Sequence, residues 1–306
     1  MRAMRDVFLE ILYENMAKNR NIFFLSADFG SPVLDKIKSD FKDRFVNVGI
    51  AEQNLINVAT GLALEGFDVY AYAIAPFITM RCFEQIRVNL AIMSEIKELN
   101  VNLIGVGAGV SYAMSGPTHH CLEDISIMNS LPNIEIFSPS DYLLVQKYVD
   151  RSLKNRYPKY LRFDAKPVKL IESSVENFED GFRVLKKGKK IAIVSTGYMS
   201  QKIMDHIDKI DVMLVDLYFI NRFDRKKFQE ILEGIETILT IEEGFVGGGL
   251  SSEINLLFKG KKVINLGFEK KYSFDIGSRE FIHEQNGIGI ANIVQIIKDI
   301  ESQGAV

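Results

Sequence analysis

Short runs of apolar residues alternate along this chain with longer segments in which apolar residues recur every three or four positions. In the first half of the chain the short runs predict β-strands over Ile22–Ser26, Phe45–Val48, Val69–Ile74, Val101–Val106, Ile134–Phe137 and Tyr160–Phe163. The periodic segments predict helices over Ala51–Leu64, Phe77–Met93 and Tyr142–Leu153. Strands that are apolar throughout and alternate with helices are typical of a parallel sheet covered on both faces.

The pattern weakens in the middle of the chain and then begins again. From about Asp164 to Lys190 the sequence is charged and only weakly periodic, as expected of a linker. Beyond it, further strands are predicted over Lys190–Ser195, Asp211–Asp216, Thr237–Ile241 and Lys262–Asn265, with helices between them. We therefore predict an α/β protein of two domains, with a parallel sheet in residues 1–165, a linker over 166–188 and a smaller α/β domain in 189–306.

Composition narrows the class of protein. The chain has 306 residues, 47% of them hydrophobic and 25% charged, which suits two folded domains better than a disordered chain. A net charge of -3 without a basic stripe argues against nucleic acid as a partner. Two cysteines, Cys82 and Cys121, are too few to staple a protein of this size and indicate a reducing compartment.

The chain also lacks the signals of membrane proteins and secreted proteins. No segment approaches the run of about 20 apolar residues that spans a bilayer. The N-terminal helical pattern is interrupted by Asp6, Glu10 and Glu14, so it lacks the apolar stretch of a secretory signal. We therefore expect a cytoplasmic protein that binds neither membrane nor nucleic acid.

The segment Phe45–Gly66 places Glu52 where a strand, a tight turn at Gly49 and a helix meet. The carboxyl edge of a parallel sheet is where α/β proteins bind ligands, although a first-turn glutamate also complements the helix dipole. The motif G-I-A-E-Q, followed by a helix rich in small residues, resembles the pyrimidine-binding domain of transketolases and 1-deoxyxylulose-5-phosphate synthases. The resemblance implies thiamine diphosphate as cofactor. It also implies that Glu52 is a catalytic and cofactor-binding residue, whose carboxyl group bonds N1′ of the aminopyrimidine and so activates C2 of the thiazolium.

Phe77, Met80 and Phe83 lie three positions apart, so they are expected to share a helix face. An apolar stripe of this kind usually packs in a core. It also resembles the family pattern F-x-x-F-x-x-Y, with Met80 in place of the middle aromatic residue and Phe83 in place of the tyrosine. The resemblance implies that these three residues bind the cofactor, with Phe77 as the best candidate for stacking on the aminopyrimidine.

The sequence S-G-P-T-H-H resembles the D-G-P-T-H loop of transketolases. This implies that His119 is catalytic and contacts the sugar near its reacting carbonyl group. A metal site at His119 and His120 is not expected, because adjacent side chains diverge and no Cys/His cluster lies nearby. Ser115 stands where the family has aspartate, and Gly107 where it has an upstream histidine. Those two family residues read sugar hydroxyls, so their absence puts the classical pentose phosphate substrates in question.

Two further matches are weaker. The sequence S-A-D-F-G-S-P resembles the family's S-A-D loop, which implies that Asp28 lies near the cofactor and Ser31 near a substrate phosphate, although a plain turn explains it equally well. Arg162 falls where the family places an arginine for the sugar phosphate, and a fork of donors suits that role. A surface ion pair is the alternative for Arg162.

The motif that holds Mg²⁺ and the diphosphate in thiamine enzymes, G-D-G, is not in this sequence. The glycine-rich Glu243–Leu250 resembles a structural segment of the transketolase C-terminal domain. The resemblance runs from the first thirty residues to the end and covers the pyrimidine-binding and C-terminal domains only. It implies that a separate N-terminal transketolase subunit carries the diphosphate-binding domain and most ligands of Mg²⁺, in an α₂β₂ assembly.

We thus expect the C-terminal (β) subunit of a two-chain transketolase, which moves a two-carbon ketol unit between sugar substrates and is active only with its partner. Two alternatives stay open. The first is a subunit that acts on a 2-oxo acid, like 1-deoxyxylulose-5-phosphate synthase or the β subunit of a 2-oxoacid dehydrogenase. The second is a non-catalytic partner subunit, which retention of G-I-A-E-Q and Phe77 makes the weaker choice.

Overall fold

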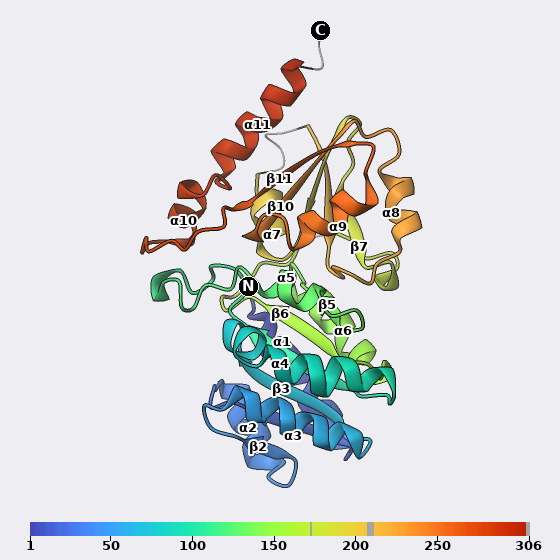
Figure 1. Cartoon of the computed structure of the whole chain (residues 1–306), viewed down its shortest axis with the longest axis vertical. Helices are drawn as coiled ribbons and strands as arrows, with labels where there is room; N and C mark the ends of the chain where they lie inside the picture. Colours follow the sequence, from blue (N-terminus) through green and yellow to red (C-terminus); the bar gives the residue numbers. More distant parts are fainter. Residues whose placement is uncertain (172, 207–210, 304–306) are drawn as a thin grey trace.

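Two β-sheets form the centres of two α/β domains that lie end to end (Figure 1). The computed structural model describes residues 1–171, 173–206 and 211–303. Residues 172, 207–210 and 304–306, which the predicted linker and second domain include, lie outside the described residues. In the described part of the chain, no helix is both long and apolar enough to cross a bilayer. The predicted α/β class with two domains is confirmed.

The first sheet has six parallel strands in the order β2-β1-β3-β4-β6-β5. Each prediction from the apolar runs corresponds to one strand, with ends shifted by at most a residue. The strands are β1 (Ile22–Ser26), β2 (Phe45–Asn47), β3 (Asp68–Ile74), β4 (Val101–Val106), β5 (Glu135–Phe137) and β6 (Lys159–Phe163).

Both faces of this sheet are covered by helices. One face packs on α1 (Met4–Lys18), α2 (Pro32–Asp40) and α6 (Tyr142–Lys154). The other packs on α3 (Glu52–Leu64), α5 (Asp124–Asn129) and the segment 77–95. Strand β3 shows the alternation, because Tyr70 and Tyr72 belong to the first core and Val69 and Ala71 to the second.

The segment 77–95 differs from the continuous α-helix that its periodicity predicts. It consists of the π-helical turns η1 (Phe77–Arg81) and η2 (Ile86–Ile92) on either side of α4 (Phe83–Gln85), and ends in η3 (Met93–Glu95). Cys82 interrupts it with φ -117° and ψ 24°. The Thr79 hydroxyl bonds the carbonyl of Ala75 four residues back, at 2.7 Å, a contact that competes with regular helix bonding. π-Helical turns are frequent at functional sites.

The second sheet has the order β11-β10-β8-β9-β7, and only β7 runs antiparallel to its neighbour. Its strands are β7 (Phe182–Lys186), β8 (Ile191–Ser195), β9 (Met213–Leu217), β10 (Thr237–Phe245) and β11 (Lys262–Phe268). Its helices are α7 (Tyr198–Met204), α8 (Arg225–Ile231), α9 (Leu250–Leu257), α10 (Arg279–Gln285) and α11 (Ile290–Gln303). Strand β7 lies inside the predicted linker, so the second sheet begins at Phe182.

Buried ion pairs join the two domains. Arg183 of β7 bonds Asp141, which follows β5, at 2.8 Å. Arg279 of α10 bonds Asp164, which follows β6, at 2.6 Å, and also pairs with Glu243 of β10. Both aspartates lie beyond the carboxyl ends of strands of the first sheet. The second domain therefore stands over part of the edge where the first sheet binds ligands.

Candidate active site

Consecutive strands of the first sheet end beside the predicted site residues. Asp28 follows β1, Glu52 follows β2, Phe77 follows β3 and His119 lies in the long loop after β4. Because all these strands are parallel, their carboxyl ends meet at one edge, and residues far apart in sequence come together there.

Glu52 is the first residue of α3 and only 2% of its surface is exposed. Its Oε2 accepts a hydrogen bond of 2.7 Å from Nη1 of Arg81, whose side chain is 44% exposed. The Arg81 guanidinium also lies over the Phe77 ring, 4.4 Å from its centroid. A ligand that bonds the Glu52 carboxyl group therefore either displaces Arg81 from it or contacts Arg81 as well. Arg81 was not predicted from the sequence, since its pairing with Glu52 spans 29 residues.

Phe77 and His119 meet across the site. Their ring centroids are 5.4 Å apart and the planes are inclined by 71°, an edge contact. The Thr118 hydroxyl lies 3.0 Å from Nδ1 of His119 and holds that ring. The Tyr112 ring also lies near His119, at 6.3 Å between centroids. Contacts thus run from Glu52 through Arg81 to the Phe77 ring, and from that ring to His119.

Gly116 shapes the loop that carries His119. Its φ of 72° is in the left-handed region, which favours glycine, and its carbonyl accepts bonds from the amides of His119 and His120. The neighbouring His120 is buried, and burial lowers its pKa, so it is a neutral residue of the loop's interior. The S-G-P-T-H-H motif therefore presents one histidine at the site and buries the other.

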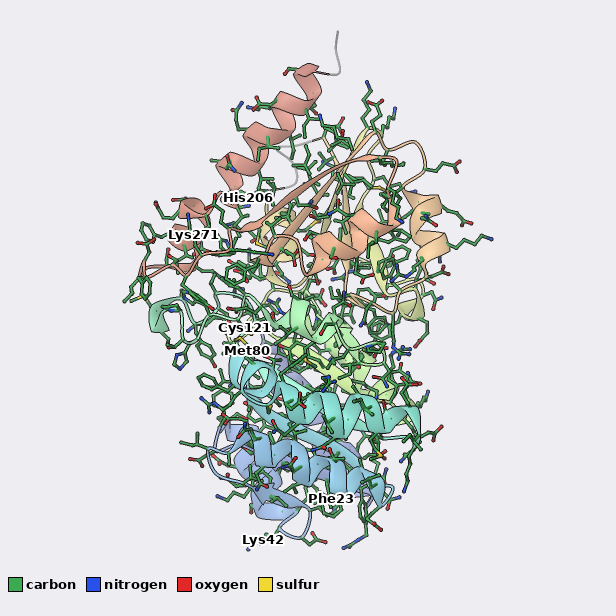
Figure 2. The ribbon with its side chains drawn as sticks, viewed as in Figure 1. Phe23, Lys42, Met80, Cys121, His206 and Lys271 are labelled. Atoms are coloured by element: carbon green, nitrogen blue, oxygen red, sulfur yellow. The ribbon has the colours of Figure 1, made fainter. Side chains whose placement is uncertain are left out.

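The three residues of the predicted apolar stripe have different surroundings, and π-helical turns interrupt the helix that carries them. Phe83 packs against the second core of the first domain. Met80 is 37% exposed, and Figure 2 shows it at the side of this domain, near the junction. Phe77 alone among them contacts both Arg81 and His119. The structure thus favours Phe77 as the residue that packs a ligand ring and gives Phe83 a core role.

Asp28 and Ser31 have different surroundings. Asp28 is exposed, has φ 52°, and its Oδ1 accepts a bond of 3.0 Å from Asn47, whose own Oδ1 holds the amide of Gly49. These bonds tie the Asp28 loop to the turn that precedes Glu52. Ser31 is buried and caps α2, with Oγ accepting from the amide of Leu34 at 3.2 Å. The cap explains Ser31 without a substrate phosphate.

Arg162 lies inside the domain junction. It is 3% exposed, its Nε bonds Asp124 at 2.6 Å, and its Nη2 bonds the carbonyl of Glu243 in the second domain at 3.0 Å. This guanidinium bonds protein oxygens in the structure, which favours a structural role, and its expected contact with a substrate phosphate stays a prediction. The alternative of an ion pair holds, although the pair is buried rather than at the surface.

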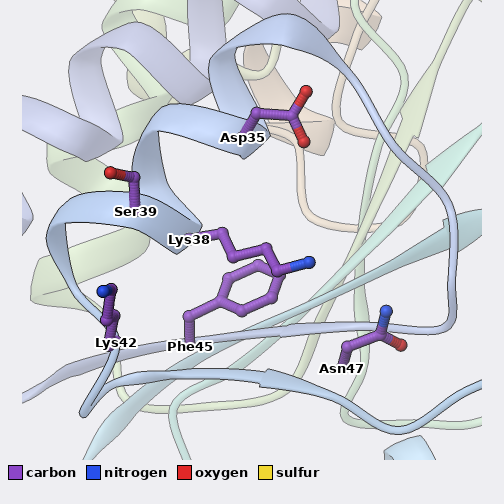
Figure 3. Close-up of a pocket in the computed structure, with 6 residues that line it drawn as sticks. All are labelled: Asp35, Lys38, Ser39, Lys42, Phe45 and Asn47. Carbon is purple, nitrogen blue, oxygen red and sulfur yellow. The ribbon is translucent and has the colours of Figure 1, made fainter.

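A separate groove of about 560 Å³ lies between α2 and β2 (Figure 3). It is lined by Asp35, Lys38, Ser39, Lys42, Phe45 and Asn47. It adjoins the Asp28 loop through Asn47, but Glu52, Phe77 and His119 are not part of its lining. In the ranges that the structure describes, no group of three or more His, Cys, Asp or Glu side chains could hold a metal ion.

Parallel α/β sheets bind ligands beyond the carboxyl ends of their strands, and the structure gathers Glu52, Phe77 and His119 at that edge. A buried carboxyl group, a ring and an imidazole on one surface provide hydrogen bonding, stacking and proton transfer. The fold and the site thus define an α/β protein with a candidate catalytic site at the sheet edge.

Comparison with known proteins identifies the family. The model of the transketolase pyrimidine-binding domain matches residues 1–168, and the model of the transketolase C-terminal domain matches residues 181–280. This chain belongs to the transketolase family, as its motifs predicted.

Three relatives are similar over most of their length. An apulose-4-phosphate transketolase subunit of Actinobacillus succinogenes is 34% identical over 219 residues, which cover 70% of this chain and 69% of the relative. A 6-deoxy-6-sulfo-D-fructose transketolase subunit of a Clostridium species is 26% identical over 256 residues, or 81% of this chain and 78% of the relative. A solved structure described as a split-gene transketolase in an inactive beta4 tetramer superposes with a TM-score of 0.83 at 28% identity, covering 98% of each chain.

Proposed function

We propose that this chain is the β subunit of a two-chain transketolase that transfers a two-carbon ketol unit between sugar substrates, with thiamine diphosphate as cofactor. The observation that carries the proposal is the buried Glu52 carboxyl group at the sheet edge, which Arg81 connects to the Phe77 ring, and Phe77 in turn contacts His119. Relatives of similar length that are named as transketolase subunits support it.

The residues of this edge fit the aminopyrimidine of thiamine. Glu52 offers a carboxyl oxygen to a ring nitrogen, and Phe77 offers an aromatic surface to the ring itself. When Glu52 bonds the ring nitrogen, Arg81 either leaves Oε2 or keeps its bond to Oε2 and holds the carboxyl group in place. When bound, thiamine diphosphate supplies the electron sink that a two-carbon transfer requires.

His119 is placed to exchange a proton with the sugar. Its Nδ1 faces the Thr118 hydroxyl, so Nε2 is the nitrogen that meets the substrate. An imidazole that is half-buried and held on one side is suited to general acid and base catalysis on a carbonyl or hydroxyl oxygen. The contact with Phe77 holds this imidazole next to the ring that would pack the aminopyrimidine.

We propose that the diphosphate and Mg²⁺ are held mainly by a separate N-terminal subunit, in an α₂β₂ assembly in the cytoplasm. The absence of a metal-ligating cluster from the described residues and of G-D-G from the sequence supports this division. A related chain that forms an inactive beta4 tetramer supports it as well. Tight, Mg²⁺-dependent binding of thiamine diphosphate by the purified chain alone would contradict it.

The direct test is Glu52→Gln in the complex reconstituted with the partner subunit. Removing the carboxyl group should lower kcat for ketol transfer by about 100-fold or more, because the cofactor's ring nitrogen loses its acid partner. Glu65→Gln changes an exposed glutamate at the opposite end of the same helix and should leave kcat unchanged. Near-normal turnover in Glu52→Gln would remove Glu52 from this role. Turnover of pyruvate in place of ketoses would favour the enzymes that act on 2-oxo acids.

A further inference from the structure

Tyr112 fills the space that a side chain at position 107 would occupy. Gly107 has φ 107°, and a Cβ built on it would lie 2.3 Å from Cε2 of Tyr112. Position 107 is where the transketolase family is expected to carry a histidine that reads the sugar. In this chain the Tyr112 ring takes that place, and it also faces His119. Tyr112 therefore forms a wall of the site beside His119.

A pocket of about 280 Å³ begins at Tyr112. It lies between the loop Ser111–Ser115 of the first domain and the segment Gly277–Arg279 of the second, with Lys166 at its side. Water occupies about 30 Å³ per molecule, so the pocket holds a group of several heavy atoms. Tyr112 connects this pocket to the site, because its side chain lines the pocket and its ring lies 6.3 Å from that of His119 between centroids.

The pocket has polar groups that lack protein partners. The side chain of Ser111 is 4% exposed, yet its Oγ has no hydrogen bond within the described part of the chain. A buried hydroxyl without a partner is costly and indicates a ligand or water at that point. Lys166 is exposed, and among the described residues no ion pair of its ammonium group is found. Its charge is therefore available to a ligand.

The other charges near the pocket are already neutralised. Arg279 pairs with Asp164 and with Glu243, so it forms a wall rather than a free cation. The two residues expected to hold a substrate phosphate are also committed, Ser31 as a helix cap and Arg162 in the domain junction. An anionic substrate must then be held by other groups.

We propose that this pocket binds the tetrahedral oxyanion at the far end of the sugar substrate, with Lys166 and Ser111 as its ligands and Tyr112 setting the length of sugar that fits. The proposal rests on the proposed function, since it requires a sugar substrate at His119. Phosphate and sulfonate share the recognised chemistry, three oxygens with negative charge. One relative is named for a sugar phosphate and another for a sulfo sugar, which supports a pocket that recognises this shared chemistry.

Binding is tested on the chain itself by isothermal titration with glycerol 3-phosphate and with glycerol. The chain should bind glycerol 3-phosphate, and Lys166→Met should weaken that binding about tenfold or more, because one charge-assisted hydrogen bond is lost. Lys166→Arg should keep it within about threefold. Lys298→Met removes an exposed lysine of α11 and should have no effect. Equal affinity for glycerol and glycerol 3-phosphate, or unchanged affinity in Lys166→Met, would overturn the proposal.

Turnover is tested in the reconstituted complex with glyceraldehyde, glyceraldehyde 3-phosphate and the corresponding 3-sulfonate as acceptors. Lys166→Met should raise KM for the two anionic acceptors about tenfold more than it raises KM for glyceraldehyde, whereas the control Lys298→Met should change none of the three values. The anionic acceptor with the higher kcat/KM in the wild-type complex shows whether the pocket is built for a phosphate or for a sulfonate. A complex that binds glycerol 3-phosphate but transfers no ketol unit to any acceptor would defeat the proposed function and leave the anion pocket standing.

The role of Tyr112 is tested by the length of the acceptor. Tyr112→Ala removes the ring of Tyr112. It should raise kcat/KM for erythrose 4-phosphate relative to kcat/KM for glyceraldehyde 3-phosphate by about fivefold or more. Tyr112→Phe keeps the ring and should retain the wild-type ratio. An unchanged ratio in Tyr112→Ala would show that Tyr112 does not set the length.

Discussion

Arg183 bonds two buried carboxylates, one in the first domain and one in its own, and its removal tests how much this buried network contributes to stability. The side chain is 4% exposed. Its Nη2 bonds Oδ2 of Asp141 in the first domain at 2.8 Å, and its Nε bonds Oδ2 of Asp216 in β9 at 3.0 Å. Both carboxylates are fully buried, so Arg183→Met leaves two like charges without their cation.

Breaking a buried ion pair by removing one partner costs about 3–5 kcal/mol. Burial already raises the pKa of Asp216, although Arg183 opposes this, so the loss of Arg183 raises it further. A carboxyl group with a raised pKa in the folded state contributes stability below its unfolded pKa, and that contribution is lost as the pH rises through the folded pKa. The deficit of Arg183→Met should therefore be larger at pH 8 than at pH 5.

The assay is urea unfolding of the chain followed by far-UV circular dichroism, with the emission of its 11 tyrosines as a second probe. At pH 8 the free energy of unfolding should fall by about 3–5 kcal/mol, and Asp216→Asn in the same chain should restore part of it. Lys226→Met removes an exposed lysine 3.9 Å from Glu230 and should leave stability unchanged. A loss below about 1 kcal/mol at both pH values would refute the reasoning.

Two further predictions concern glycine strain and a buried lysine. Gly107→Ala should destabilise the chain by about 2 kcal/mol or more, because position 107 has φ 107° and the new Cβ meets the Tyr112 ring. In a double-mutant cycle, adding Tyr112→Ala should recover about half of this loss. Strictly additive effects of the two substitutions would contradict the clash. Burial lowers the pKa of Lys159 to about 7, so between pH 7 and pH 9 the unfolded chain binds a proton that the folded chain does not. The free energy of unfolding should thus rise with pH over this range in the wild type and less steeply in Lys159→Met. Urea titrations at each pH would measure both dependences. Equal dependence on pH in the two proteins would show that the pKa of Lys159 is not lowered.

The first sheet was predictable from the sequence because its strands are buried on both faces. A strand such as β4 (Val101–Val106) is apolar at nearly every position, and that run is visible without any structure. The position of Glu52 was predictable for the same reason, since a strand, a glycine and a helix follow one another within a few residues. The family motifs around Glu52 and His119 then gave the class of enzyme.

The sequence alone did not reveal β7 (Phe182–Lys186). Its apolar pattern contains Arg183, which periodicity assigns to solvent but which the structure buries between two aspartates. A charge in a strand can be buried only where a partner is brought from elsewhere in the chain, here Asp141 from the other domain. The strand was therefore hidden in what composition presented as a linker.

The sequence by itself determined the family, the alternation of strands and helices, and the edge of the sheet at which the site lies, because each depends on residues close together along the chain. Only the tertiary structure decided which partner each polar side chain takes. It paired Arg81 with Glu52, enclosed Arg162 in the domain junction and placed Tyr112 over Gly107. Such pairings depend on the packing of distant segments, and that packing leaves no periodic signal in the sequence.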